Sequence, residues 1–266
     1  MLSKLLKHEY RATARIMLPV YVLVAGAALL FNLFMRLADR YNNVALEFFR
    51  VTSIMIFVVT LIGAGVVTLG LMVFRFYKNY MTDEGYLMFT LPATTDQLIL
   101  SKLIVALSWT VLTVLAVVLG VFLGTLGLVD WSAIEPQLSL FFSEFAGIFP
   151  KSYLPLLAIS LFVSAVNSFL LFYAAISLGH SFANRKILLS VAFYFAFSAG
   201  MRSVSSIVSI FSVVFSDNLF SENVTDAAVS SYMMGTQILS ICLSLIFAIV
   251  FYIVTRLLLK KRLNLQ

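Results

Sequence analysis

The sequence predicts an all-α integral membrane protein with six membrane-spanning helices. Its 266 residues are 62% hydrophobic and only 11% charged, with a mean hydropathy of +1.03, whereas a soluble domain carries about a quarter charged residues. Six apolar segments are long enough to cross the hydrocarbon core, which takes about 20 helical residues. Short connections join them, so residues 1–266 are expected to form one membrane domain. The predicted spans are residues 16–35, 51–74, 98–123, 154–178, 187–215 and 236–259.

Residues 1–15 predict an amphipathic helix ahead of the first span. Leu2, Leu5 and Leu6 share one helical face, and basic residues fill much of the remainder. Such a helix lies at the level of the lipid headgroups, and we expect the chain to turn into the membrane at Pro19. A basic tail that only fixes the orientation of the first span is the alternative. The basic residues of this predicted interfacial helix are Lys4, Lys7, Arg11 and Arg15.

The distribution of basic residues predicts the topology. Thirteen of the 18 Lys and Arg residues fall on the side that carries both termini, four fall on the other side, and Arg202 lies within a span. Because cytoplasmic loops are enriched in Lys and Arg, both termini are expected to be cytoplasmic, with an outer loop at 216–235. Cations that flank apolar spans do not form the single basic face typical of nucleic-acid binding, so no nucleic-acid partner is expected.

Residues 79–97, between the second and third spans, predict a short cytoplasmic helix. Thr82 is placed to cap its first turn, where Asp83 and Glu84 suit the positive end of the helix dipole. Proline disfavours helix at the residue before it, so this helix should end ahead of Pro92. The sequence Thr-Thr-Asp-Gln at 94–97 then fits a capping box that begins the third span.

The same segment is more apolar than a water-exposed loop needs to be. Large apolar side chains follow its acidic start, at Tyr86, Leu87, Met88 and Phe89. Contiguous apolar surface marks a membrane surface or a protein partner. Two interpretations follow from these residues: a loop that lies among the headgroups, or a helix that docks into a groove on a cytoplasmic protein.

Two phrases in the sequence resemble those of a known family. The segment MTDEGYLMFTLPATTDQLILSKL, preceded by RFYKN, is similar to the cytoplasmic coupling region of type-2 ATP-binding-cassette exporter permeases. The opening MLSKLLKHEYRATARIMLP resembles their N-terminal interfacial helix. Six spans with both termini inside is also the family's topology, so the resemblance covers essentially the whole chain.

The resemblance implies a transport mechanism in which the helix after the second span sits in a cleft of a separate ATPase subunit. A second permease copy or a paralogue would complete the path, and ATP and magnesium would bind to the ATPase partner. The setting would be the bacterial plasma membrane, and the cargo an amphipathic or hydrophobic peptide, lipid-linked molecule or drug. The residues implied to contact the ATPase are Thr82, Asp83, Glu84, Gly85, Tyr86, Leu87, Phe89 and Pro92.

No motif in the chain predicts an enzyme or a bound cofactor. The sequence has no Gly-Lys dipeptide, and therefore no phosphate-binding loop of the G-x-x-x-x-G-K-[ST] type. It has one cysteine, Cys242, and its two histidines are far apart in the sequence, at His8 and His180, which makes a metal site improbable. A membrane-embedded enzyme is therefore disfavoured. A polytopic sensor or scaffold that recruits another cytoplasmic partner remains the alternative to a permease.

Polar residues inside the predicted spans are candidates for a path or gate. Arg202 is the clearest, because an ionisable residue in a span is costly and is a functional hypothesis by default. It is expected to form an ion pair with Asp217, Glu222 or Asp226, or to contact substrate. Close helix packing is the alternative role for the small polar residues. The candidate path or gate residues are Asn167, Ser198, Arg202, Ser205 and Ser209.

Overall fold

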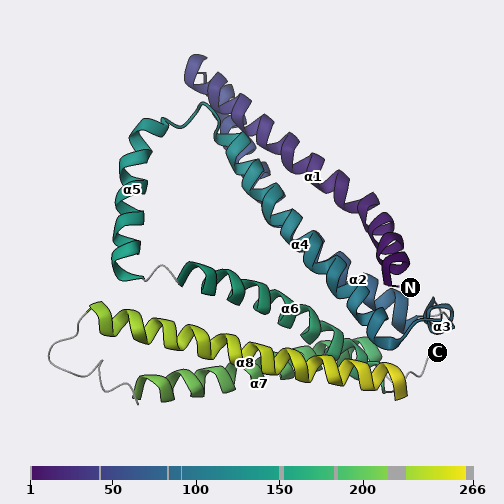
Figure 1. Cartoon of the computed structure of the whole chain (residues 1–266). Coiled ribbons are helices and arrows are strands. Elements are labelled where there is room, and N and C mark those ends of the chain that lie inside the picture. The colour runs from purple at the N-terminus through teal and green to yellow at the C-terminus, as the bar shows by residue number, and fades with distance from the viewer. Residues whose placement is uncertain are drawn as a thin grey trace. The chain divides into compact units, whose positions relative to one another are not determined.

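The computed structural model describes residues 2–41, 43–82, 84–90, 92–149, 153–182, 185–214 and 226–261. These residues form helices and no strand (Figure 1). Six helices are long and apolar enough to cross a membrane, which confirms the prediction of a multi-pass, all-helical membrane protein. The helices are α1 (Leu2–Tyr41), α2 (Val44–Met81), α3 (Glu84–Phe89), α4 (Thr95–Thr125), α5 (Trp131–Ile148), α6 (Tyr153–Gly179), α7 (Lys186–Val214) and α8 (Asp226–Lys261).

The chain divides into two compact units. The first comprises Met1–Phe76 and Leu91–Ile134, and contains α1, α4 and most of α2. The second comprises Tyr77–Thr90 and Glu135–Gln266, and contains α3, most of α5, α6, α7 and α8. Each unit has its own packed interior.

In the first unit, α1 packs along α4 through small residues. A Cβ atom added at Gly120 would lie 2.8 Å from Cγ1 of Val24, and one at Gly124 would lie 3.1 Å from Cδ1 of Phe31. Glycines four residues apart let two membrane helices approach closely. Side chains of α2 complete this core, where Phe57 stacks on Phe31 with ring centroids 5.1 Å apart.

The C-terminal end of α4 is capped by polar side chains of α1. The Nδ2 group of Asn32 donates hydrogen bonds of 2.8 Å to the carbonyls of Gly124 and of Leu126. The Nη2 group of Arg36 donates to the Leu126 carbonyl at 2.6 Å. The last four carbonyls of a helix have no hydrogen-bond donor within the helix. Asn32 and Arg36 supply donors to carbonyls at the end of α4, which lipid chains cannot do.

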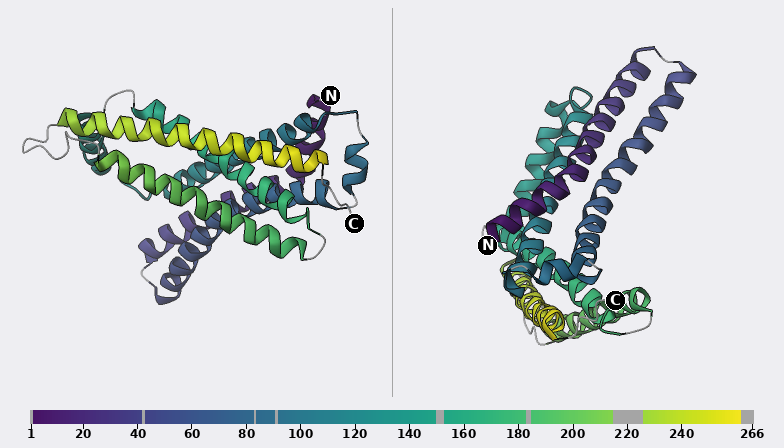
Figure 2. Two further views of the ribbon diagram at one scale, coloured as in Figure 1. Left: turned by 90° about the horizontal axis from the view of Figure 1, so that it is seen from below. Right: turned by 90° about the vertical axis from the view of Figure 1, so that its right-hand side faces the viewer.

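In the second unit, α6 is the central helix and packs on both α7 and α8. Helices α6 and α8 run side by side in both Figure 1 and Figure 2. Aromatic pairs join the helices: Phe172 of α6 stacks on Tyr194 of α7 at 4.5 Å between ring centroids. Phe197 of α7 meets Phe251 of α8 at 5.5 Å.

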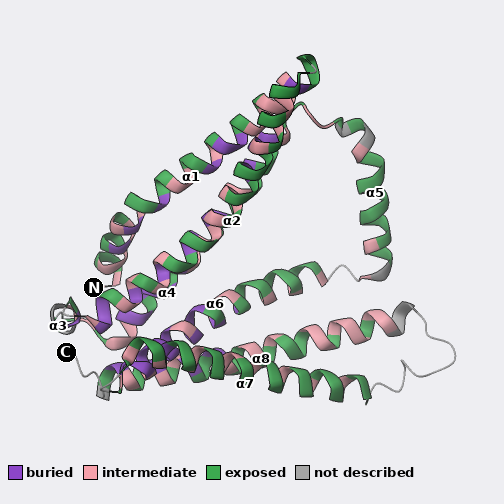
Figure 3. Ribbon diagram, turned by 180° about the vertical axis from the view of Figure 1, so that it is seen from behind, coloured by how far each residue is buried: buried purple, intermediate pink, exposed green. Residues whose placement is uncertain are grey.

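Three features of the helices differ from the sequence prediction. Pro19 lies inside α1, which is one helix from Leu2 to Tyr41, so residues 2–15 and the first span are not separate elements; the expected change of direction at Pro19 stays a prediction. Helix α8 begins at Asp226, so part of the predicted outer loop is helical; residues 215–225 lie outside the described residues. Helix α5 was not predicted, because serines, glutamates and Pro136 interrupt its apolar residues; it is exposed along most of its length (Figure 3).

The end of α6 meets the start of α7 at a very close contact. A Cβ atom added at Gly179 would lie 2.5 Å from the backbone nitrogen of Ser190 and 2.6 Å from its Cα. Backbone atoms cannot rotate away as the end of a side chain can. Only glycine therefore fits at this position without moving one helix relative to the other.

His180 follows Gly179 and is buried against the same junction. Its Nδ1 atom lies 2.9 Å from the Ile176 carbonyl oxygen and 3.3 Å from Oγ of Ser190, and its ring centroid is 5.3 Å from that of Tyr77. Burial lowers the pKa of His180, and the charge of Lys186 acts in the same direction, while the Ile176 carbonyl opposes both. The folded protein therefore favours the neutral imidazole.

We predict that Gly179→Ala destabilises the protein by about 2–3 kcal/mol, which is typical of overpacking. Thermal unfolding in detergent measures the loss. Gly200→Ala is the matched control, because Gly200 lies within α7 and an added Cβ there meets no atom within 4 Å. Equal unfolding temperatures for the two variants would contradict the close contact at Gly179.

The stability of the protein should fall as the pH drops through about 6.5, the ordinary pKa of histidine. In this window the unfolded chain takes up the proton while folded His180 resists it, so protonation favours unfolding. Unfolding temperatures measured from pH 8 to pH 5.5 should therefore decline less for His180→Gln than for the wild type. His8→Gln, at an exposed position of α1, should leave the decline unchanged. A decline of wild-type size in His180→Gln would contradict this account.

Candidate functional site

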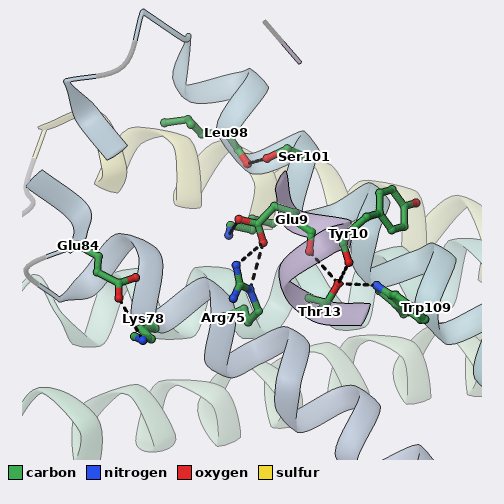
Figure 4. A network of polar contacts seen from close by, with 10 residues as sticks. Glu9, Tyr10, Thr13, Arg75, Lys78, Glu84, Leu98, Ser101 and Trp109 are labelled. Carbon is green, nitrogen blue, oxygen red and sulfur yellow. Dashed lines mark hydrogen bonds and ion pairs between the residues drawn. The ribbon is translucent and has the colours of Figure 1, made fainter. Parts of the chain in front are cut away.

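A buried ion cluster joins the three helices of the first unit. Glu9 of α1 lies between Arg75 of α2 and Lys102 of α4. Figure 4 shows its contact with Arg75. Its Oε1 atom is 2.5 Å from Nζ of Lys102, and its Oε2 atom accepts hydrogen bonds of 3.0 Å and 3.2 Å from Nη2 and Nε of Arg75. The side chains of Glu9 and Lys102 are each only 4% exposed.

The energetics of this cluster depend on all three charges. Taking a carboxylate and two cations out of water is expensive, and paired geometry with hydrogen bonds is what offsets the cost. Two nitrogens of the Arg75 guanidinium share one carboxylate oxygen, and Lys102 takes the other. Removal of Glu9 would leave the buried Lys102 and the half-buried Arg75 without their counter-ion. The cluster therefore constrains where α1, α2 and α4 can sit.

Polar contacts continue from Glu9 along the same face of α1. The hydroxyl of Thr13 accepts a hydrogen bond of 2.7 Å from Nε1 of Trp109 and donates one of 2.8 Å to the Glu9 carbonyl. Tyr10 donates to Oγ of Ser108 at 2.6 Å. Glu9, Thr13 and Met17 are all buried and are four residues apart, so they form one helical face. This face holds the N-terminal part of α1 against α4.

The ion cluster also joins α2 to α4, the two helices that precede and follow the predicted coupling segment in the sequence. Arg75 is near the end of α2, and Lys102 is near the start of α4.

The start of α4 has one half of the predicted capping box. Thr94 is extended, at φ −74° and ψ 151°, and its side chain accepts a hydrogen bond of 3.3 Å from the backbone N–H of Gln97. That prediction for Thr94 is confirmed.

Helix α3 lies within this segment, but Thr82 does not cap it as expected. The Thr82 hydroxyl donates a hydrogen bond of 2.5 Å to the Lys78 carbonyl, so it closes the end of α2. The Thr82 carbonyl accepts a bond of 2.8 Å from the N–H of Gly85. Helix α3 begins at Glu84, whose carboxylate lies 3.1 Å from Nζ of Lys78 (Figure 4). The Thr82 hydroxyl therefore bonds to the end of α2, whereas a capping side chain would accept from a backbone N–H in the first turn of α3.

The other predicted ATPase contacts are placed only in part. Gly85 is buried and Pro92 is exposed. Asp83 lies outside the described residues, as do the side chains of Tyr86, Leu87 and Phe89.

The structure does not bring the predicted path residues together as one site. Asn167 is buried and donates from Nδ2 to Sδ of Met201 at 3.1 Å, which joins α6 to α7. Ser209 donates to the carbonyl of Ser205 within its own helix at 2.9 Å. Ser198 is half-buried.

Arg202 is exposed, and none of the described residues forms an ion pair with it. Its expected partners Asp217 and Glu222 lie outside the described residues, as does the side chain of Asp226. Helix α7, which carries Arg202, runs from Lys186 to Val214, in agreement with the predicted fifth span.

The N-terminal basic residues Lys4, Lys7, Arg11 and Arg15 are all exposed on α1. The sequence patterns did not point to Glu9, which is the centre of the buried ion cluster. The available signal was that Glu9 is the only acidic residue before Asp39, in a strongly basic stretch.

We predict that Glu9→Gln destabilises the protein by about 3–5 kcal/mol, the usual cost of breaking a buried pair from one side. Thermal unfolding in detergent measures the change. Glu47→Gln is the matched control, because Glu47 lies 2.8 Å from Arg50 but that pair is about one-third exposed. An exposed pair contributes about 1 kcal/mol or less, so the control should unfold near the wild-type temperature.

The double variant Glu9→Gln, Lys102→Met tests the cause of that loss. Since Met removes one of the two uncompensated cations, the double variant should unfold at a higher temperature than Glu9→Gln alone. No recovery would show that the loss does not come from uncompensated charge.

Comparisons with known proteins do not assign these residues a role. A scan against protein-family models finds no match, and neither does a search of curated proteins or of solved structures. The sequence pattern and the side-chain contacts described above therefore carry the assignment of function.

Proposed function

We propose that this protein is the permease subunit of an ATP-binding-cassette exporter in the bacterial plasma membrane. It acts with a separate ATPase subunit and with a second permease copy or a paralogue, and both of its termini are cytoplasmic. The observation that carries the proposal is the segment between α2 and α4, where a short helix with an acidic start and apolar residues separates two membrane-length helices. The chain itself has no phosphate-binding loop, so ATP and magnesium would bind to the partner.

Helix α3 is the proposed coupling helix. Tyr86, Leu87 and Phe89 supply apolar anchors for a cleft on the ATPase, and buried aromatic anchors dominate binding energy at protein interfaces. Glu84 and Asp83 supply negative charge that sets orientation and association rate. The ion pair of Glu84 with Lys78 supports this role, because it ties the start of α3 to the end of α2.

The Glu9 cluster supports the transmission of force from the proposed contact between α3 and the ATPase. Arg75 and Lys102 belong to the two helices between which the coupling segment lies, and Glu9 binds both. A displacement of the segment is then delivered to α1, α2 and α4 together. ATP binding and hydrolysis on the partner would switch access to a path enclosed by two permease chains. Asn167 and Arg202 are proposed to line or gate that path, and the cargo is amphipathic or hydrophobic.

The test is copurification of the intact chain with candidate ATPase subunits. The double variant Tyr86→Asp, Phe89→Asp should lose the ATPase subunit with an affinity loss of about a hundredfold or more, since each buried aromatic anchor contributes about 2 kcal/mol. The matched control is Phe141→Asp, Phe142→Asp, which introduces the same charges at exposed aromatic positions of α5. This control should keep the ATPase.

Retention of the ATPase by a folded Tyr86→Asp, Phe89→Asp variant would contradict the docking role of α3. An intact wild-type chain that binds no ATPase at all would contradict the permease proposal and favour a sensor or scaffold.

A further inference from the structure

The N-terminal part of α1 carries a continuous basic face. At about 100° per residue, its basic side chains fall within an arc of about 100° and extend over about 16 Å of helix. All of them are exposed. This basic face consists of Lys4, Lys7, His8, Arg11 and Arg15.

The contacts of α1 with α4 fix the rotation of α1 about its own axis. The basic face therefore points away from α4. Glu9, Thr13 and Met17 lie on the opposite side of the helix and are 3%, 1% and 0% exposed. The ion pairs of Glu9 and the bond from Trp109 to Thr13 hold that side in place. Leu2, Leu5 and Leu6 are half-buried on the side of Glu9. The apolar residues of this part therefore face the protein, and the cations face outward.

The basic face has no compensating negative charge among the described residues. None of its five side chains forms an ion pair there. Glu9 is the only acidic residue before Asp39, and it is engaged by Arg75 and Lys102 on the other side of the helix. Uncompensated cations in a tight group attract an anionic partner.

The same stripe of α1 becomes apolar farther along the helix. Leu18, Val22, Leu29 and Leu33 fall on the side of the basic face by helical periodicity, and they are 57%, 72%, 59% and 50% exposed. One side of α1 therefore presents cations first and apolar side chains afterwards. This order matches a phospholipid, whose charged headgroup is followed by acyl chains.

We propose that the basic face of α1 binds the headgroups of anionic phospholipids in preference to zwitterionic ones. The partner is lipid, because the basic face continues directly into the exposed apolar stripe of a membrane-length helix, so lipids whose acyl chains pack on that stripe place their headgroups beside the cations. This inference rests on the six membrane-length helices and on the contacts of Glu9, and it does not depend on an ATPase partner.

Native mass spectrometry of the full chain in detergent, with equal amounts of dioleoylphosphatidylglycerol and dioleoylphosphatidylcholine, tests the proposal. The wild type should retain phosphatidylglycerol about tenfold or more over phosphatidylcholine, since each basic residue near an anionic surface favours binding about fivefold. Neutralising the face should bring this preference close to one. The variant carries Lys4→Gln, Lys7→Gln, Arg11→Gln and Arg15→Gln.

Two control variants separate the effect of the basic face on lipid preference from the effects of net charge and of side-chain shape. The first removes four exposed cations that are scattered over the chain, and it should keep the preference. The second exchanges Lys and Arg within the face and should also keep it. The substitutions are Arg40→Gln, Arg185→Gln, Arg256→Gln and Lys260→Gln for the first, and Lys4→Arg, Lys7→Arg, Arg11→Lys and Arg15→Lys for the second.

An unchanged preference in the neutralised variant would overturn the proposal, and so would an equal loss in the scattered-charge control. The wild type gives a further test that needs no variant. Its preference for phosphatidylglycerol should fall as salt rises from about 0.05 M to about 0.5 M, because ions screen exposed charges. A preference that does not change with salt would also overturn the proposal.

Discussion

The burial of Glu9 between Arg75 and Lys102 is the interaction on which the arrangement of the first unit depends. The carboxylate comes from α1, and its two partners come from α2 and α4. Because the uncompensated charges would be costly away from water, the three helices have one arrangement that satisfies all of them. The rotation of α1 follows from this arrangement. One face of its N-terminal part meets α4 through Glu9, Thr13 and Met17, and the basic face is left outside.

The rest of the first unit is held by contacts that suit a helix bundle in lipid. Gly120 and Gly124 permit close approach of α4 to α1, and Asn32 satisfies carbonyls at the end of α4. These contacts lie toward the opposite end of α4 from Lys102, so α1 and α4 are joined along their length. The proposed coupling segment lies between α2 and α4, at the ends that Glu9 ties together.

The parts of this structure that sequence predicts well are those set by local pattern. Six spans follow from apolar runs of membrane length, and the start of α4 follows from the Thr94–Gln97 spacing. The Glu9 cluster could not be predicted in this way, because Glu9 and Arg75 are 66 residues apart and meet only in the folded bundle. Pro19 was expected to mark a turn, yet packing of α1 along α4 holds one continuous helix through it. Helix α5 was not predicted, because polar residues interrupt its apolar pattern.

The most direct test of the central role of Glu9 is hydrogen–deuterium exchange of the wild type and of Glu9→Gln in detergent. If the Glu9 cluster holds the end of α2 and the start of α4 together, its loss should expose the backbone near all three ion partners. Amides near residues 5–15, 72–80 and 98–106 should then exchange about a hundredfold faster in the variant, because the expected local loss is about 3 kcal/mol. Amides around Asn32 and Gly124, at the other end of the same helices, should lose less protection. Unchanged exchange, or an equal rise along all of α1 and α4, would contradict the account.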